Sequence, residues 1–308
     1  MGDPTTADPL ERFEAAVRAR VGADAEDWLV TLPDLISAVT ATWDLHVTAV
    51  ANRIDAFGMS IPARRDDERV TIRLAFPDAT FADETAALEA WSGEGAVRVL
   101  ETDPRGAQLR SSPSPGTALT LERNEMRALR LAADAMRSLW IEPPAGIQTL
   151  ASEARAWGST LIERFESVHD PFEEHLVRDA EMMFRSFVAT QARSVLLHGD
   201  VRLDGFVLDG ERAVALDAKP LVGEPAFDAA SLLRDGPGEL VRDRAAGVQR
   251  LQGRLDQLTD LLDLRAGRVR GWALAVSVDT GLFAYESGDV DGGDLMIEIA
   301  RMCQLLKA

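Results

Sequence analysis

Two aspartates on either side of a short hairpin pattern are the residues whose types and spacing could perform chemistry. Asp200 follows an apolar run in "SVLLHGD", and Asp217 follows a second apolar run in "AVALD". Residues 206–208 and 213–216 read as two strands around a turn at 209–212, and such a hairpin would return Asp217 to the loop that begins at Asp200. Two carboxylates so placed suit phosphoryl transfer, in which one orients the attacking hydroxyl and the other holds magnesium on the phosphates. Ordinary turn positions are the alternative interpretation.

The elements that would position these aspartates fall into two halves of different character. Residues 46–111 carry the alternating apolar pattern of antiparallel strands, interrupted by one helical segment at 80–93. The linker "SSPSPGT" follows, and a mostly helical half comes after it. Helical spacing is found at 10–22, 33–42, 119–139, 147–168, 171–192, 226–234, 239–263 and 265–286. The pattern therefore predicts an α+β protein with two lobes.

The composition limits the classes of function. A net charge of −18 with no basic stripe excludes a nucleic-acid partner and favours a cationic small molecule. No apolar run approaches the roughly 20 residues of a membrane span, and the acidic N-terminus lacks the order of a secretory signal. Cys303 is the only cysteine, which excludes an internal disulfide and predicts a cytoplasmic location. Only two lysines occur, Lys219 and Lys307.

The motifs around the two aspartates resemble those of a known family. "LLHGD" followed by "ALDAKPLVGEPAFDAASLLRD" resembles the aminoglycoside phosphotransferase family, in its streptomycin-kinase and hydroxyurea-resistance branch. The segments "EGAVRVLETDP", "SPGTAL" and "RVRGWALAVSVDTGLF" resemble the same branch in the same order, so the resemblance covers roughly residues 28–303.

This resemblance implies a protein-kinase-like bilobal fold that uses ATP and Mg²⁺. The N-terminal lobe, 1–112, would hold the leading helices, a small antiparallel sheet and one helix, and the C-terminal lobe, 113–308, would be mostly helical. Asp200 matches the catalytic aspartate of the family and Asp217 its metal-binding aspartate. By the same resemblance His198 would brace the catalytic loop, and we expect a structural, helix-capping role for Asp228.

The catalytic loop departs from the family pattern at one metal ligand. The asparagine that the family places five residues after the catalytic aspartate is Gly205 here, and glycine offers no side-chain oxygen. Asp204 lies one position earlier and could supply a carboxylate to the metal if the loop shifts. A position that faces solvent or stabilises the turn is the alternative for Asp204.

The N-terminal half departs from the pattern at the phosphate-binding lysine. The matching stretch "VTIRLAF" places Arg73 at that position, and no lysine precedes Lys219. Glu84 matches the helix glutamate that pairs with the lysine, so an Arg73–Glu84 pair is expected to grip the nucleotide phosphates. A guanidinium is a broad planar group rather than a compact point charge, so the exchange is not neutral.

Two further segments are expected to contact the nucleotide. The loop of residues 53–60 contains one glycine, Gly58, and backbone N–H groups from Gly58 to Ser60 are candidate phosphate donors. Asp55 in that loop would repel phosphates if it pointed inward. The linker with Ser111 and Ser112 is expected to offer hydrogen bonds to the adenine.

The acceptor side is expected on the late helices. Asp279 and Glu286 lie seven residues apart on one helical face, and Trp272 adds aromatic surface. A guanidinium-bearing aminocyclitol would suit this site. The alternative is a solvated acidic helix with Trp272 in the core.

Two functions agree with these observations. The first is an ATP-dependent phosphotransferase that moves the γ-phosphoryl group to a hydroxyl of a small, cationic, antibiotic-like acceptor. The second is a catalytically impaired, pseudokinase-like relative that binds a ligand or nucleotide without efficient turnover. The exchanged residues Arg73 and Gly205 are the features that distinguish the two.

Overall fold

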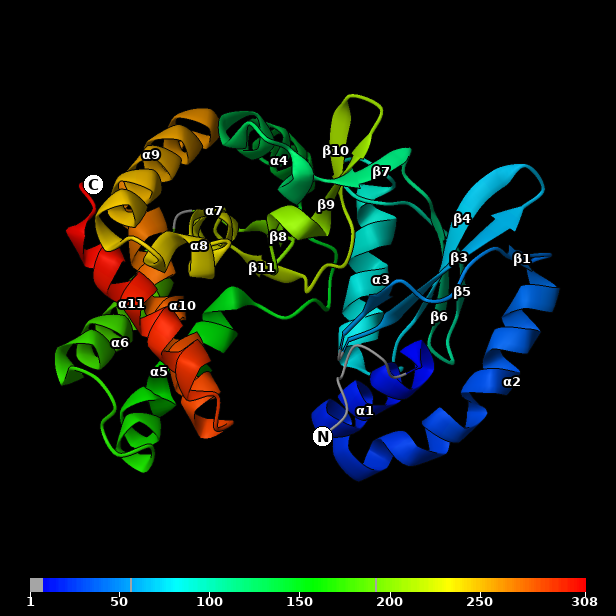
Figure 1. Ribbon diagram of the computed structural model, residues 1–308, viewed down its shortest axis with the longest axis horizontal. Helices are drawn as coiled ribbons and strands as arrows, with labels where there is room; N and C mark the ends of the chain where they lie inside the picture. The colour runs from blue at the N-terminus through cyan, green and yellow to red at the C-terminus, as the bar shows by residue number, and fades with distance from the viewer. Residues whose placement is uncertain (1–7, 56, 192) are drawn as a thin grey trace. The chain divides into compact units, whose positions relative to one another are not determined.

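The computed structural model describes residues 8–55, 57–191 and 193–308, and the chain forms two compact units, Met1–Gly116 and Thr117–Ala308. The acidic N-terminal heptapeptide, one residue of the 53–60 loop and the last residue of the expected helix 171–192 lie outside the described residues. Figure 1 shows the elements of both units.

The first unit is built on an antiparallel sheet. The strand order is β1–β3–β4–β6–β5, with β2 also paired to β3. A two-residue turn joins β3 to β4, where Arg65 pairs with Glu68 and Asp66 has a φ of 54°, as tight hairpins require. The strands are β1 (His46–Val47), β2 (Arg53–Ile54), β3 (Met59–Arg65), β4 (Glu68–Leu74), β5 (Val99–Asp103) and β6 (Ala107–Ser111).

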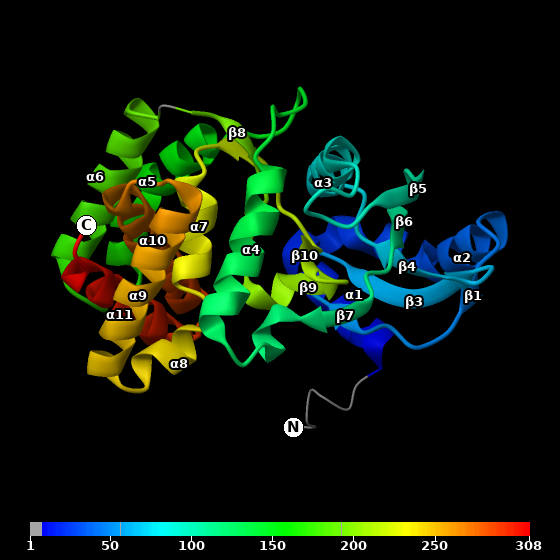
Figure 2. The same ribbon diagram turned by 90° about the horizontal axis from the view of Figure 1, so that it is seen from above.

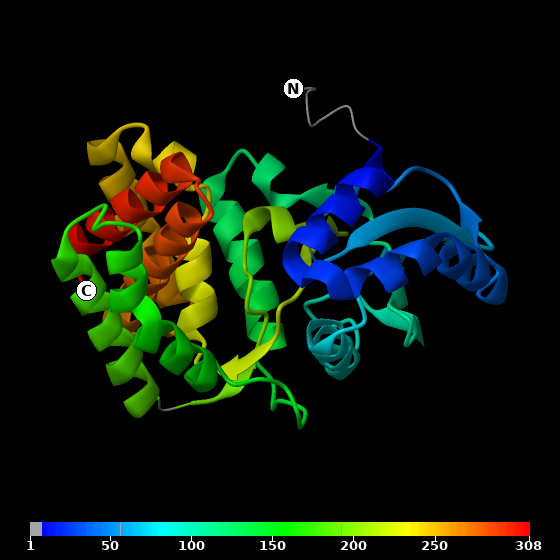
Figure 3. The ribbon, with the colours of Figure 1, turned by 90° about the horizontal axis from the view of Figure 1, so that it is seen from below.

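Helices cover both faces of this sheet. Helices α1 and α2 lie on one face and α3 on the other (Figures 1 and 3). Asp8 and Asp78 cap the N-termini of α1 and α3 with their side chains. The bounds are α1 (Pro9–Val21), the 3₁₀ turn η1 (Gly22–Ala25), α2 (Glu26–Thr42) and α3 (Ala79–Trp91).

The two faces of the sheet differ in chemistry because side chains alternate along a strand. Ile61, Ile72 and Leu109 are aligned across three neighbouring strands and belong to the apolar core shared with α1 and α2. The adjacent row across the same strands is Ser60, Arg73 and Gln108, and it is buried as well. The face toward α3 is therefore a buried polar layer.

The second unit is mostly helical and contains two small sheets. One sheet has the order β10–β9–β7 and the other pairs β11 with β8. The strands are β7 (Pro115–Ala118), β8 (Val195–Leu197), β9 (Phe206–Asp209), β10 (Arg212–Ala215) and β11 (Leu221–Gly223), and 3₁₀ turns occur at η2 (Leu119–Leu121) and η3 (Leu203–Gly205). The α+β architecture agrees with the prediction from the sequence.

Helix α10 forms the centre of this unit. It packs against α6, α7 and α11, and Figure 2 shows it among these helices. The helices are α4 (Glu125–Leu139), α5 (Leu150–Ser167), α6 (Glu174–Ala189), α7 (Ala226–Leu233), α8 (Pro237–Val241), α9 (Arg244–Leu262), α10 (Ala266–Glu286) and α11 (Val290–Leu305). The expected helix 239–263 is divided into α8 and α9, because Asp243 caps the N-terminus of a new helix at Arg244. Helix α11 was not predicted. Among the described helices, none has the length and apolarity needed to span a bilayer.

Candidate active site

A hairpin returns the chain to the loop that carries Asp200. Strands β9 and β10 pair antiparallel, with Phe206 opposite Ala215. The pairing continues where Leu216 N donates to Gly205 O at 2.9 Å. Farther along, Lys219 N donates to His198 O at 2.9 Å. The segment 216–219, which contains Asp217, therefore runs along the loop 198–205, and the predicted reversal of the chain is confirmed.

Glycine at position 199 makes this close approach possible. Gly199 has a φ of +80°, and a Cβ at this position would overlap the carbonyl oxygen of Lys219. Both observations require a residue without a side chain. The glycine of the His-Gly-Asp motif thus lets the two loops lie against each other.

Asp200 is held as an ionised carboxylate. Lys219 Nζ lies 3.0 Å from Asp200 Oδ2, and Arg202 Nε lies 3.7 Å from Oδ1. Burial raises the pKa of Asp200, but the charges of Lys219 and Arg202 outweigh it and leave the pKa below its usual value. The backbone N–H of Asp200 donates to Nδ1 of the buried His198 at 3.3 Å. An ionised carboxylate in a fixed loop can accept a hydrogen bond from a hydroxyl.

Asp228 braces this loop, which corrects the expected helix cap. It lies inside the first turn of α7, is fully buried, and accepts hydrogen bonds from His198 N at 3.0 Å and Gly199 N at 2.9 Å. Trp140 Nε1 donates to the same carboxylate at 3.1 Å. Sequence spacing could not show that a helix residue reaches a loop 28 residues away, because the fold alone brings them together.

Asp235 holds the other end of the loop. Its Oδ2 accepts from Leu203 N at 2.9 Å, and Arg254 Nη1 donates to the carbonyl of Asp235 at 2.6 Å. The loop of Asp200 is thus fixed at both ends by carboxylates from the segment around α7. Such support keeps a reacting group in one geometry.

Candidate metal ligands are limited to carboxylates near this loop. Asp204 lies 3.5 Å from Arg202 Nε with a half-exposed side chain. Within the described residues no group of three or more His, Cys, Asp or Glu side chains is gathered for a metal. Magnesium commonly takes only one or two protein carboxylates and completes its shell with phosphates and water, so Asp217 with one further carboxylate fits it.

Sequence reasoning missed Arg234. Its Nε is buried and has no hydrogen-bond partner among the residues that the structure describes. Burial lowers the pKa of Arg234, while the charges of Asp200, Asp235 and Asp279 raise it. The residue was detectable as a lone basic residue in the apolar run "AASLLRD". A half-buried guanidinium within the electrostatic range of Asp200 can bind an anionic oxygen.

The structure places the predicted acceptor residues in different environments. Trp272 belongs to the core: it is 1% exposed, packs on Phe184, Phe187 and Phe227, and donates to Glu224, so the expected aromatic wall is wrong. A tryptophan at the centre of α10 is surrounded by other helices.

Asp279 and Glu286 do come together, on a pocket of about 480 Å³. Arg164 from α5 binds both, with Nη1 at 2.6 Å from Asp279 and Nε at 2.9 Å from Glu286. Burial raises the pKa of Asp279 although Arg164 opposes this shift. The chain's own guanidinium therefore occupies the position expected for a guanidinium acceptor.

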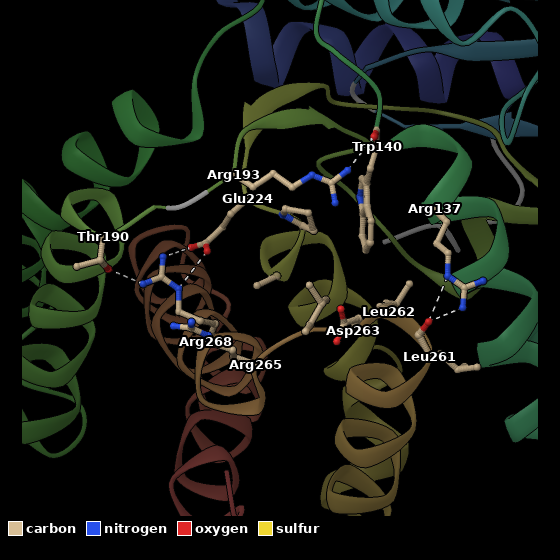
Figure 4. Close-up of a pocket in the computed structure, with 13 residues that line it drawn as sticks. Arg137, Trp140, Thr190, Arg193, Glu224, Leu261, Leu262, Asp263, Arg265 and Arg268 are labelled. Atoms are coloured by element: carbon tan, nitrogen blue, oxygen red, sulfur yellow. Dashed lines mark hydrogen bonds and ion pairs between the residues drawn. The ribbon is translucent and has the colours of Figure 1, made fainter.

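A second pocket, of about 590 Å³, includes Trp140 in its lining. Figure 4 shows Trp140 and Glu224 on its wall, with Arg268 bound to Glu224 and Thr190. Arg137 binds the carbonyl of Leu261 on another side. Trp140 also supports Asp228, so this wall is continuous with the support of the catalytic loop.

In the first unit, the expected Arg73–Glu84 pair is replaced by another. Glu84 Oε2 is paired with Arg110 Nη2 at 2.8 Å. Arg73, 1% exposed, lies 3.5 Å from Ser60 Oγ and 3.7 Å from Asp55 Oδ1. Two arginines, Arg73 and Arg110, lie in the polar layer of the sheet. Which of them pairs with Glu84 on α3 is decided by strand register, and the residue pattern does not reveal that register.

The loop between β2 and β3 is closed on itself. Asp55 Oδ1 accepts from Phe57 N at 2.7 Å and from Gly58 N at 2.8 Å. Ser60 lies inside β3 rather than in the loop, and it is 5% exposed. The amide of Gly58, expected as a phosphate donor, is therefore already engaged.

The linker serines also have internal partners. Ser111 N donates to Arg98 O at 2.8 Å, and Ser111 Oγ accepts from Arg98 N at 3.0 Å. Ser112 Oγ lies 2.7 Å from Thr71 Oγ1. These contacts fix the end of β6.

Comparisons with known proteins agree with the geometry. A family model described as aminoglycoside/hydroxyurea antibiotic resistance kinase matches residues 61–288. A hydroxyurea phosphotransferase of Kitasatospora aureofaciens is 31% identical over 92% of this chain and 81% of its own length. A streptomycin 6-kinase of Streptomyces glaucescens is 26% identical over 90% of this chain and 91% of its own length.

Solved structures show the same fold at low identity. An aminoglycoside phosphotransferase has a TM-score of 0.62 at 13% identity, covering 90% of this chain and 99% of its own. A choline kinase of Streptococcus pneumoniae has a TM-score of 0.61 at 12% identity, covering 89% and 98%. The kinase-like fold predicted from the sequence is confirmed.

Proposed function

Because this chain belongs to the aminoglycoside/hydroxyurea antibiotic resistance kinase family, we propose that it transfers the γ-phosphoryl group of ATP to a hydroxyl group of a small molecule. One observation carries the proposal. The loop of Asp200 is braced by Asp228 and Asp235, and the hairpin returns the Asp217 segment along it. Phosphoryl transfer requires two carboxylates near each other, and the adjacency of these two backbone segments supports that assignment for Asp200 and Asp217.

In this mechanism Asp200 accepts the hydrogen bond of the acceptor hydroxyl and orients it for attack. Lys219 and Arg202 keep Asp200 ionised. Asp217, with Asp204 as a second candidate, would hold magnesium, which when bound neutralises charge on the phosphates. Arg234 adds a positive charge that interacts electrostatically with Asp200.

Nucleotide binding is assigned to the first unit. Arg73 supplies a fixed cation to the phosphates, and Glu84 acts through Arg110 rather than through Arg73. Ser60 supports Arg73 from β3. Ser111 and Ser112 lie at the end of β6, where the linker to the second unit begins.

We propose a cationic acceptor for the pocket of Asp279 and Glu286. Among the residues that line this pocket, two carboxylates accompany one cation, Arg164, so the lining carries an excess of negative charge. Streptomycin is a suitable probe because relatives of this chain are streptomycin 6-kinases. Binding measured by calorimetry should weaken as salt rises; no heat at low salt would remove this substrate class. A cytoplasmic location, where ATP is available, is part of the proposal.

A second candidate function is a relative with impaired turnover. Gly205 cannot bind a metal, and Asp55 engages the loop amides that would contact phosphates. Under this alternative the protein would bind its ligand without turning it over.

A thermal-shift titration with ATP, with and without magnesium, tests the proposal. We expect ATP to raise the unfolding temperature only when magnesium is present, because ligand binding to the folded state stabilises it. An Asp217→Asn variant should lose the magnesium-dependent part of the shift. No shift of the unmodified protein at millimolar ATP and magnesium would contradict nucleotide binding.

A further inference from the structure

The β2–β3 loop of the first unit contains a formed anion site. Two backbone N–H groups, of Phe57 and Gly58, point at one oxygen, and the guanidinium of Arg73 approaches the same oxygen at 3.7 Å. Adjacent backbone N–H groups beside a cation form the kind of concavity that binds phosphate. The oxygen in this position is Oδ1 of Asp55, from the same chain.

The surrounding structure fixes this site without help from the carboxylate. Arg73 is 1% exposed and lies so close to Gly58 that a Cβ there would overlap its guanidinium. Strands β2 and β3 pair through Arg53 and Ser60 on either side of the loop. The donors are therefore held by the sheet and by the buried arginine.

The loop tip has an anchor of its own. Arg20 lies 5.1 Å from the centroid of the Phe57 ring and binds Asp78 at 2.7 Å. Such a cation–π contact holds the ring from the side of α1. The position of Phe57 N thus does not depend on Asp55 alone.

Asp55 itself is free to leave. Its side chain is 46% exposed, in contrast to the buried Arg73 that it faces. A half-exposed carboxylate can turn into water at small cost, since its solvation is already partly in place. The carboxylate and a phosphate cannot occupy the site together because both are anions.

We propose that Asp55 is an affinity-determining residue whose carboxylate competes with a nucleotide phosphate for Phe57 N, Gly58 N and Arg73. The inference rests on the proposed function, since the phosphate is that of ATP. Nucleotide binding then requires Asp55 to turn outward, and the unmodified protein binds ATP weakly.

Calorimetry with ATP and magnesium tests this inference on three full-length variants. Asp55→Ala removes both charge and hydrogen bonds and should lower Kd about tenfold, as expected for one screened like charge. Asp55→Asn keeps one side-chain oxygen that can accept hydrogen bonds but loses the charge. Its Kd should therefore lie between that of Asp55→Ala and that of the unmodified chain. Asp67→Asn removes one charge from the exposed β3–β4 turn of the same unit and should leave Kd unchanged.

The outcomes separate the inference from the proposed function. Equal Kd values for all four proteins, or weaker binding by Asp55→Ala, would overturn the competition while nucleotide binding itself stands. A Kd for Asp55→Ala that is tenfold or more below that of the unmodified chain would support the competition most strongly. No binding by any of them at millimolar ATP would overturn the proposed function, and with it the inference. Unfolding temperatures of the variants check that each is folded.

Discussion

Each of two loops in this molecule contains an aspartate that is bound by other groups of the same chain. The two loops differ in how many of their residues match the family's motif. In the second unit Asp200 is paired with Lys219 and retains the matched catalytic position. In the first unit Asp55 closes a loop whose cation is an arginine instead of the family's lysine. The two aspartates assigned to chemistry are thus retained, although Gly205 replaces the asparagine of their loop, whereas the phosphate-binding lysine of the first unit is replaced by Arg73. We infer that the second unit determines the reaction and the first unit determines nucleotide affinity.

The supports of the two loops differ in the same way. The loop of Asp200 is braced by two carboxylates, Asp228 and Asp235, that bond to its backbone. The loop of Asp55 is held by the pairing of β2 with β3 and by the buried Arg73, and no carboxylate from another element is bonded to its described backbone groups. Changes in the first loop should therefore alter affinity, whereas changes in the second should alter turnover.

The largest expected effect is that of Asp217→Asn. Losing a carboxylate that holds magnesium should lower kcat by roughly a hundredfold or more, in line with a loss of a few kcal/mol of transition-state stabilisation. Steady-state kinetics at saturating ATP measure it. Glu211→Gln, at the exposed tip of the same hairpin, is the matched control and should leave kcat unchanged. Equal effects of the two substitutions would show that Asp217 has no special role.

The next largest effect is expected for Arg234→Met. Removing a cation within range of Asp200 should lower kcat about tenfold or more with little change in the KM for the acceptor. The free energy of unfolding should stay the same or rise, because a buried guanidinium nitrogen without a partner is lost. A destabilised variant with unaltered kcat would instead identify Arg234 as a structural residue.

A smaller effect, in the opposite direction, is expected for Gly205→Asn. A Cβ at this position meets no atom within 4 Å, so the first atom of a side chain fits without displacement. Restoring an amide oxygen should lower the magnesium concentration for half-maximal activity several-fold. Titration of activity with magnesium measures this change, and an unaltered midpoint would show that the chain has compensated for the missing asparagine.

The smallest effect is a shift in pH dependence caused by Lys219→Met. The charge of Lys219 lowers the pKa of Asp200, and Asp200 acts when deprotonated, so activity is lost as the pH falls through this pKa. Without Lys219 the pKa of Asp200 rises, and the acid limb of kcat/KM should move to higher pH. A profile that does not move would exclude Asp200 as the group that titrates.

Much of this site could be predicted from local sequence patterns. The rest depends on contacts between residues that are distant in the sequence. The hairpin and the neighbourhood of Asp200 and Asp217 followed from apolar alternation and turn residues, which act over a few positions. The partners of Asp228, Glu84 and Trp272 did not follow, because each is set by packing between elements distant in sequence.

The same limit explains the missed arginines. Arg164 stands in a helical segment where an arginine is typical of a solvated surface, and Arg234 was marked only by the apolar run before it, which names no partner. Their contacts become visible only in the fold, where α5 and α10 bring Arg164 to Asp279 and the end of α7 lies against the loop of Asp200. A sequence pattern does not show whether a charged side chain is buried or which distant residue it contacts.

The central claim is that the retained loop in the second unit transfers a phosphoryl group. Mass spectrometry of streptomycin and of hydroxyurea after incubation with ATP, magnesium and the protein tests it most directly. We expect one acceptor to gain a single phosphoryl group with the unmodified protein, and product formation to fall by two or more orders of magnitude with Asp200→Asn, the range of general-base catalysis. Equal product formation by both proteins would contradict the assignment of Asp200, and no product from any small hydroxyl compound would contradict the claim itself.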